Sequence, residues 1–241
     1  MPENSPERYP IRINRYLSLK NYATRKGADT LVEQGLVTIG GRVAVLGDKV
    51  REGDVVEVNK ALEQEVEKRT YLAYNKPAGV VTSLPQNGQQ SIEDVTHFPK
   101  KVFPIGRLDK DSRGLLILTD DGRITDKLLN PKYVHEKEYV VEVHKPVALE
   151  FLKRMGRGVR LDGGEVTKPA EVRKMTKNKF KIIITEGKKR QIRRMCRSLG
   201  YEVLDLCRTR IMGIRLDDIP EGEYRKIKGK ALEEFLKSLG M

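Results

Sequence analysis

The 241-residue sequence has no tryptophan, three histidines and two cysteines, and only 6% of its residues are aromatic. Because Cys196 and Cys207 have no second pair beside them, we expect reduced thiols rather than a disulfide framework or a zinc site. The histidines show no ligand spacing, so we expect no metal. No apolar run approaches the roughly 18 to 20 residues that cross a bilayer, and the N-terminus lacks the apolar core of a signal peptide. We therefore expect a cytoplasmic protein without a membrane partner.

Acidic residues are outnumbered by basic ones. The chain has 34 Asp and Glu against 47 Lys and Arg, which gives a net charge of +13 and a pI near 9.6. Residues 168–215 hold 15 basic and four acidic residues, so this stretch carries +11 of the total. Such an excess favours a polyanionic partner, nucleic acid above all. The alternative is a solvated surface that keeps the protein soluble.

The length suggests two domains, since 38% hydrophobic residues suffice for a medium-sized core and a small one. We predict a disordered leader over residues 1–10, which contain three prolines. A small domain over 11–58, a polar linker over 59–69 and a larger domain over 70–241 complete the predicted order.

The small domain is predicted to contain two helices followed by a hairpin. Apolar residues recur at helical spacing from Ile13, and Thr24 is placed to cap a second helix that Gly35 would end. The pair Gly40–Gly41 lies between two apolar-alternating runs and suits the positive φ angles of a tight hairpin turn. A further strand is expected at 54–58.

The larger domain alternates strands and helices. Pro77 should end its first strand, which starts at Tyr71, and the apolar run at 114–119 predicts a strand covered on both faces. We expect an α+β fold with a mixed, mainly antiparallel central sheet. The other expected strands lie at 102–105, 137–143, 159–161, 170–173 and 179–185, and the expected helices at 124–129, 151–155 and 191–199.

Residues 12–58 resemble the RNA-binding domain named after ribosomal small-subunit protein S4. The resemblance implies that basic residues around the helix pair and hairpin contact phosphates, which would position RNA without reading its sequence. The alternative is a basic packing domain. Gly27 departs from the family pattern, so the second helix is expected to start late or fray. The basic residues concerned are Arg12, Arg15, Arg25, Lys26, Arg42 and Lys49.

The most specific motif is GRLDKDSRGLLILTDDG at 106–122, where Asp109 lies in a loop before the buried strand, among Arg107, Lys110 and Arg113. Nearby cations favour the ionised carboxylate that a nucleophile requires. The alternative is an Asp109–Arg107 salt bridge within a turn. The motif resembles that of RNA pseudouridine synthases, and the resemblance implies that Asp109 is catalytic and that Arg107 holds an extruded nucleotide. We assign Asp111 no catalytic role.

The segment HEKEYVVEV at 135–143 matches a second motif of that family, which carries a tyrosine, here Tyr139. The resemblance implies that its ring stacks on the flipped uracil and that its phenol exchanges a proton. Taken alone, a tyrosine in a strand is more often part of the core.

The third matching segment is EGKKRQIRRMCRSLGYEV at 186–203. The family implies that Arg193 is catalytic and pairs with Asp109. Like charges at helical spacing repel one another and destabilise an isolated helix, so such a cluster indicates that anions bind among the arginines. The alternative is a helix whose charges are simply solvated. Candidates for phosphate contacts are Lys188, Lys189, Arg190, Arg194 and Arg197, while Arg208 and Arg210 are divided evenly between RNA contact and structural pairing. The NKP element at 75–77 is interpreted as support for the active-site loop.

The resemblance covers residues 11 to about 227 and implies isomerisation of a uridine to pseudouridine, without cofactor or metal. The strings FPIGRLDKDS, HEKEY and RTRIM are most similar to a branch that modifies bacterial large-subunit ribosomal RNA, free or in an assembly intermediate. We expect a monomer. The alternatives are a synthase acting on transfer RNA, a non-catalytic ribosome-assembly factor and an RNA N-glycosylase.

Overall fold

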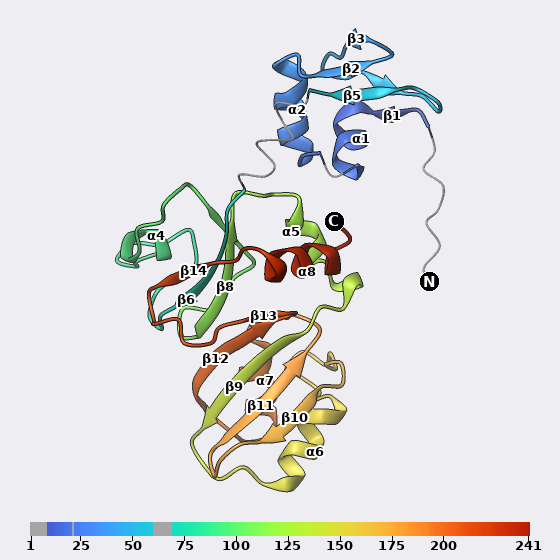
Figure 1. Ribbon diagram of the computed structural model, residues 1–241. Coiled ribbons are helices and arrows are strands. Elements are labelled where there is room, and N and C mark those ends of the chain that lie inside the picture. Colours follow the sequence, from blue (N-terminus) through green and yellow to red (C-terminus); the bar gives the residue numbers. More distant parts are fainter. Residues whose placement is uncertain (1–8, 21, 60–68) are drawn as a thin grey trace. The chain divides into compact units, whose positions relative to one another are not determined.

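The computed structural model describes residues 9–20, 22–59 and 69–241, and the chain forms two compact units (Figure 1). The first runs to Arg69 and includes residues 121–124; the second comprises residues 70–120 and 125–240. Most of the leader expected at 1–10 and of the linker expected at 59–69 lies outside the described residues.

In the N-terminal unit, the short strand β1 (Ile11–Arg12) is followed by two helices, α1 (Ile13–Leu19) and α2 (Arg25–Glu33). The Thr24 hydroxyl accepts a hydrogen bond from the N–H of Gly27 at 3.0 Å and satisfies one of the free donors of the first turn. The expected late start of α2 is therefore wrong, because Gly27 is part of the cap. Gly35, at φ +70°, follows the helix as predicted.

Short strands complete this unit. Gly40 and Gly41 have φ angles of +57° and +79° in the turn of the predicted hairpin. The strands are β1 (Ile11–Arg12), β2 (Val37–Ile39), β3 (Arg42–Val43), β4 (Lys49–Val50) and β5 (Val56–Val58), in the orders β1-β4 and β3-β2-β5. The helices contribute Ile13, Leu17, Ala28, Leu31 and Val32 to a core shared with Val37, Ala44 and Val50.

The second unit is built on a nine-stranded sheet in the order β10-β11-β9-β12-β8-β6-β14, with β7 beside β8 and β13 beside β12 (Figure 1). All described pairs are antiparallel except β8 with β12. The strands are β6 (Tyr71–Lys76), β7 (Phe103–Ile105), β8 (Arg113–Thr119), β9 (Lys137–Val143), β10 (Glu171–Lys174), β11 (Lys179–Ile184), β12 (Val203–Ile211), β13 (Ile214–Arg215) and β14 (Tyr224–Lys226).

Helices cover this sheet. Phe151 of α6 and Ile192 and Met195 of α7 belong to the same buried cluster as Val141 and Phe180 of the central strands. No helix in the described part is long and apolar enough to cross a membrane. The helices are α4 (Ile92–Val95), α5 (Ile124–Leu129), η1 (Pro131–Tyr133), α6 (Leu149–Arg157), α7 (Gln191–Ser198) and α8 (Lys230–Ser238).

The predicted α+β class with a mainly antiparallel sheet is confirmed, but several elements differ from expectation, and α4, α8, β13 and β14 were not predicted. Residues 159–161 form no strand, because only Arg160 makes an isolated bridge, to Val166. The nine-residue strand β12 was not predicted, since charged residues interrupt its apolar pattern. It lies between β8 and β9, and so at the centre of the sheet.

Candidate active site

The loop between β7 and β8 carries Asp109 and is held from two sides. The N–H of Leu108 donates to the Thr82 hydroxyl at 3.1 Å, and that hydroxyl donates to the Leu108 carbonyl at 3.0 Å. The N–H of Ser112 donates to the Asp109 carbonyl at 3.0 Å and closes a turn. Asp109 therefore sits on a backbone with little freedom, which a reacting group requires.

A fully buried lysine supports the same loop. Lys76, the last residue of β6, donates from Nζ to the carbonyls of Val80 at 2.6 Å and Lys110 at 3.4 Å. Burial lowers the pKa of Lys76 to about 8, although the carboxylates of Asp111 and Asp109 act in the opposite direction. This placement agrees with the supporting role predicted for the NKP element.

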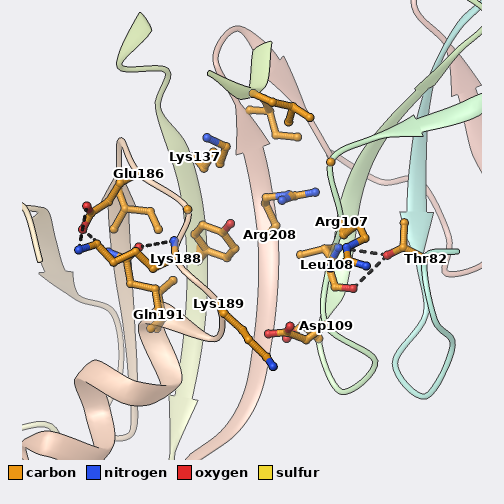
Figure 2. Close-up of a pocket in the computed structure, with 18 of the residues that line it drawn as sticks. Thr82, Arg107, Leu108, Asp109, Lys137, Glu186, Lys188, Lys189, Gln191 and Arg208 are labelled. Carbon is orange, nitrogen blue, oxygen red and sulfur yellow. Dashed lines mark hydrogen bonds and ion pairs between the residues drawn. The ribbon is translucent and has the colours of Figure 1, made fainter. Parts of the chain in front are cut away.

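A pocket of about 820 Å³ opens beside this loop (Figure 2). Asp109, on the loop between β7 and β8, and Tyr139, on β9, both line it although they are distant in the sequence. Tyr139 is 8% exposed, and its hydroxyl makes no hydrogen bond within the described residues. The structure thus brings two of the three predicted catalytic residues into one cavity.

Arg193 is not among the residues that line the pocket, and its expected pairing with Asp109 is not found within the described residues. Its Nη2 donates to the Asp111 carbonyl at 2.7 Å, and its Nε lies 3.4 Å from the Asp111 carboxylate. Its Nη1 donates to the Val203 carbonyl at 3.1 Å. Arg193 therefore joins α7 and β12 to the active-site loop, two residues beyond Asp109.

The cations that flank Asp109 in sequence do not pair with it. Arg107 is exposed at the pocket, and no ion pair of Asp109 exists within the described residues, so the alternative of an Asp109–Arg107 salt bridge is not found. Arg113 instead binds the Asp205 carboxylate through two hydrogen bonds of 2.9 Å. That pair fixes the start of β8 to β12.

The predicted phosphate-binding cluster is largely paired internally. Two hydrogen bonds of 3.0 and 2.7 Å join Arg190 to Asp111, and they lower the pKa of Asp111. Lys188 and Arg194 both bind Glu165, at 3.0 and 2.9 Å. Their availability to RNA phosphates stays a prediction. Asp111 thus joins two arginines of the third motif to the loop that carries Asp109.

The other predicted RNA-contacting cations are exposed. Arg42 is held by Asp48 at 2.8 Å, but it remains 60% exposed. The side chains of the rest form no ion pair within the described residues; these are Arg12, Arg15, Arg25, Lys26, Lys49, Lys189 and Arg197.

Two lining cations were not assigned to the site from the sequence. Arg208 of β12 is 4% exposed, and Lys137 of β9 is half-buried; both face the pocket (Figure 2). Burial, and then the charge of Arg208, lowers the pKa of Lys137. Arg210 belongs to the structural alternative, since it binds Glu136 at 2.9 Å and lines no pocket wall. A regular strand would place Arg208 and Arg210 on the same face, and it is the irregular pairing between them, Arg208 opposite Tyr139 but Arg210 opposite Glu138, that gives them different surroundings.

These features place the carboxylate of Asp109 in a cation-rich pocket beside a central sheet, an arrangement suited to an enzyme. Residues 70–198 match the family model described as RNA pseudouridylate synthase, and residues 11–56 match the S4 domain. The chain belongs to the RNA pseudouridylate synthase family. This confirms the resemblance in the motifs and goes against the two alternatives outside the family, a non-catalytic assembly factor and an N-glycosylase.

Individual relatives agree with this family. The dual-specificity RNA pseudouridine synthase RluF of Escherichia coli K12 is 44% identical over 229 residues, covering 94% of this chain and 79% of the relative. Ribosomal large subunit pseudouridine synthase B of Bacillus subtilis strain 168 is 35% identical, covering 90% and 91%. A pseudouridylate synthase crystal structure superposes with a TM-score of 0.67 at 29% identity, covering 95% of this chain and 99% of that one. The similarity to one branch of the family, predicted from the strings FPIGRLDKDS, HEKEY and RTRIM, is confirmed by the identity to RluF.

Proposed function

We propose that this synthase isomerises a uridine of bacterial large-subunit ribosomal RNA and that Asp109 is its reacting carboxylate. The observation that carries the proposal is the pocket in which Asp109 and Tyr139 meet, at a loop held by buried hydrogen bonds. The choice of RNA is supported by the name of the Bacillus subtilis relative, a ribosomal large subunit pseudouridine synthase.

The exposed cations bind the RNA. Arg12, Arg15, Arg25 and Lys26 of the N-terminal unit contact phosphates, while Arg107 and Lys189 act at the pocket itself. Arg107 holds the target nucleotide in its extruded position, because a stacked base offers no access to its glycosidic bond. Such contacts position the RNA before chemistry begins.

The chemistry exchanges one bond for another. The bond from uracil N1 to ribose C1′ breaks, the ring turns, and uracil C5 bonds to C1′. The proton leaves C5, and N1 gains one, so substrate and product are isomers. Asp109 acts either as a nucleophile or as a base, and both roles require its ionised form. Tyr139 stacks against the base, and its unpaired hydroxyl can pass a proton.

Arg193 acts in this scheme through the loop. It holds the carbonyl and carboxylate of Asp111, which Arg190 also binds. A side chain that fixes the backbone two residues from Asp109 sets the direction of the reacting carboxylate. Arg193 is therefore a positioning residue.

The test is release of tritium from C5 of uracil in large-subunit ribosomal RNA. We expect release by the wild type and a loss of at least about 1,000-fold in Asp109→Asn, which keeps the side-chain shape but removes the charge. Asp218→Asn is the matched control, since Asp218 is exposed and lines no pocket wall. Comparable release by Asp109→Asn and the control, with both folded and binding RNA equally, would contradict the role of Asp109.

Transfer RNA is the second candidate substrate. The name of the Escherichia coli relative, a dual-specificity RNA pseudouridine synthase, states more than one specificity, so a second class of RNA is tested as well. The same assay with transfer RNA, free ribosomal RNA and an assembly intermediate decides among the substrates by their relative rates. Action on ribosomal RNA as a cytoplasmic monomer completes the proposal, and a sedimentation measurement of the free protein tests its oligomeric state.

A further inference from the structure

Arg208 makes fewer hydrogen bonds than its burial demands. The side chain is 4% exposed, and its Nε donates to the Leu115 carbonyl at 2.7 Å. Its Nη2 is buried and has no hydrogen-bond partner within the described residues. A buried guanidinium N–H without an acceptor destabilises the fold, so such a group marks a place where a ligand atom supplies the acceptor.

The position of Arg208 relates it to the base rather than to the RNA backbone. In the antiparallel pair β9–β12, Arg208 lies directly opposite Tyr139, and both line the pocket. On its other side it lies opposite Gly114 of β8, where a Cβ atom would collide with the backbone of Arg208. Figure 2 shows Arg208 in the middle of the lining, with Arg107 and Lys189 elsewhere on it. Those two cations are exposed and suited to phosphates.

Basic residues outnumber the two acidic ones, Asp109 and Glu186, in the lining of the pocket around Arg208. Lys137 lines the same pocket, and neither cation forms an ion pair within the described residues. Arg208 lowers the pKa of Lys137, in addition to the effect of burial, and contributes to the low pKa of Lys76. Uncompensated cations in a pocket shielded from water stabilise a negative charge there more strongly than cations in solvent do.

The reaction generates such a charge. When the bond from N1 to C1′ breaks, its electron pair leaves with the uracil, and the resulting negative charge spreads over N1 and the carbonyl oxygens. The ring then turns, C5 attacks C1′, and the C5 proton is lost. A donor aimed at a carbonyl oxygen binds the detached ring more tightly than the neutral base, which lowers the barrier.

We propose that Arg208 donates a hydrogen bond from its free guanidinium nitrogen to a carbonyl oxygen of the target uracil, and that it stabilises the uracil anion after bond cleavage. This rests on the proposed function, since it needs the uridine in the pocket. It makes Arg208 a catalytic residue, whereas Arg193 acts through the loop.

The test combines enzyme variants with modified substrates. Arg208→Met keeps the stem and removes the donors, and we expect the single-turnover rate of tritium release to fall by roughly 100- to 1,000-fold, with RNA affinity nearly unchanged. Sulfur is a poorer acceptor than oxygen, so RNA with 2-thiouridine or 4-thiouridine at the target should slow the wild type. Where the sulfur replaces the oxygen that Arg208 binds, the substitution should slow Arg208→Met much less than it slows the wild type, because the variant has already lost the hydrogen bond.

Arg210→Met is the matched control, because Arg210 is on the same strand but outside the pocket. The fold-loss of rate caused by Arg210→Met should multiply with the fold-loss caused by each thio substitution, as expected for independent changes. If the fold-losses of Arg208→Met and of both thio substitutions also multiply in this way, the proposal is overturned. A phosphate contact would instead give coupling between Arg208→Met and a methylphosphonate beside the target, which also overturns it.

Two measurements keep the outcome interpretable. If Arg208→Met does not fold, Arg208→Lys undergoes the same comparison, since it keeps a charge but loses the planar set of donors. A failure of the proposed function is recognised separately, because the wild type would then release no tritium from unmodified RNA.

Discussion

Basic residues serve differently in the two units. In the N-terminal unit, Arg12, Arg15, Arg25 and Lys26 (the N-terminal cations) are exposed, and their side chains form no ion pair within the described residues. In the second unit, most basic residues of the third motif bind acidic side chains or backbone carbonyls. These paired cations are Lys188, Arg190, Arg193 and Arg194.

The exposed N-terminal cations are suited to RNA docking, whereas the paired cations of the second unit hold the candidate site together. Unpaired exposed cations can neutralise phosphates and release counterions, which supports binding to many RNA sequences. Cations held by carboxylates and carbonyls instead tie segments far apart in the chain, as Arg190 and Arg193 tie α7 to the loop of Asp111. A count of basic residues therefore overstates the RNA-binding surface of the second unit.

The largest expected effect concerns the stability of the second unit at alkaline pH. Lys76 has a folded pKa of about 8 against 10.5 when unperturbed, so between these values the unfolded chain binds more protons. Stability should therefore rise with pH in that window, by at most about 3 kcal/mol. Urea unfolding at several pH values measures this, and the rise should disappear in Lys76→Met. Lys26→Met, which removes an N-terminal cation, should keep it; a rise retained in Lys76→Met would contradict the assignment.

Next in size is the loss of Arg193. Arg193→Met releases the Asp111 carbonyl and should reduce the single-turnover rate by about 100-fold, because a small displacement of the reacting group suffices for such a loss. RNA affinity should change little. Arg154→Met, on the exposed face of α6, is the control. A loss of affinity with an unchanged rate would place Arg193 among the docking residues instead.

Removing the N-terminal cations should produce the reverse pattern. Changing all four to Gln should weaken RNA binding by roughly 10- to 50-fold at moderate salt, and it should flatten the salt dependence by about one logarithmic slope unit for each phosphate that these side chains neutralise. The rate at saturating RNA should be nearly unchanged. Filter binding over a salt series measures both the affinity and the slope, and an unaltered slope would show that this surface does not bind phosphates.

The smallest effect is expected from a change of Glu165, whose carboxylate binds both Lys188 and Arg194. Glu165→Gln frees Lys188 and Arg194 and should strengthen RNA binding about two- to threefold at low salt. The same salt series measures it, with Glu171→Gln as the control on an exposed edge strand. Affinity equal to the wild type would mean that both cations serve the fold alone.

Local signals predicted much of this structure. The cap at Thr24, the hairpin turn at Gly40–Gly41 and the buried strand β8 each depend on residues adjacent in the chain, and all three are found. The motif with Asp109 and the motif with Tyr139 also identified two residues that share a pocket.

Predictions that needed a partner distant in the chain fared less well. Arg193 binds Asp111 rather than Asp109, and β12, whose apolar pattern is broken by charges, was overlooked. The choice between RNA contact and structural pairing therefore stayed open for Arg208. A charged side chain in a strand can be paired, solvated or aimed into a cavity, and its own sequence does not distinguish these states.

Turn chemistry, capping and hydrophobic period act over a few residues, so the order of amino acids was sufficient for the class of fold. The resemblance of contiguous motifs indicated the S4 domain and the candidate carboxylate of Asp109. Which charged side chains pair with each other depends on their distances across the folded sheet. The electrostatic interaction between them weakens with separation and strengthens with burial. Only the assembled second unit therefore showed that Asp111 gathers the arginines, while Arg208 keeps a free donor beside Tyr139.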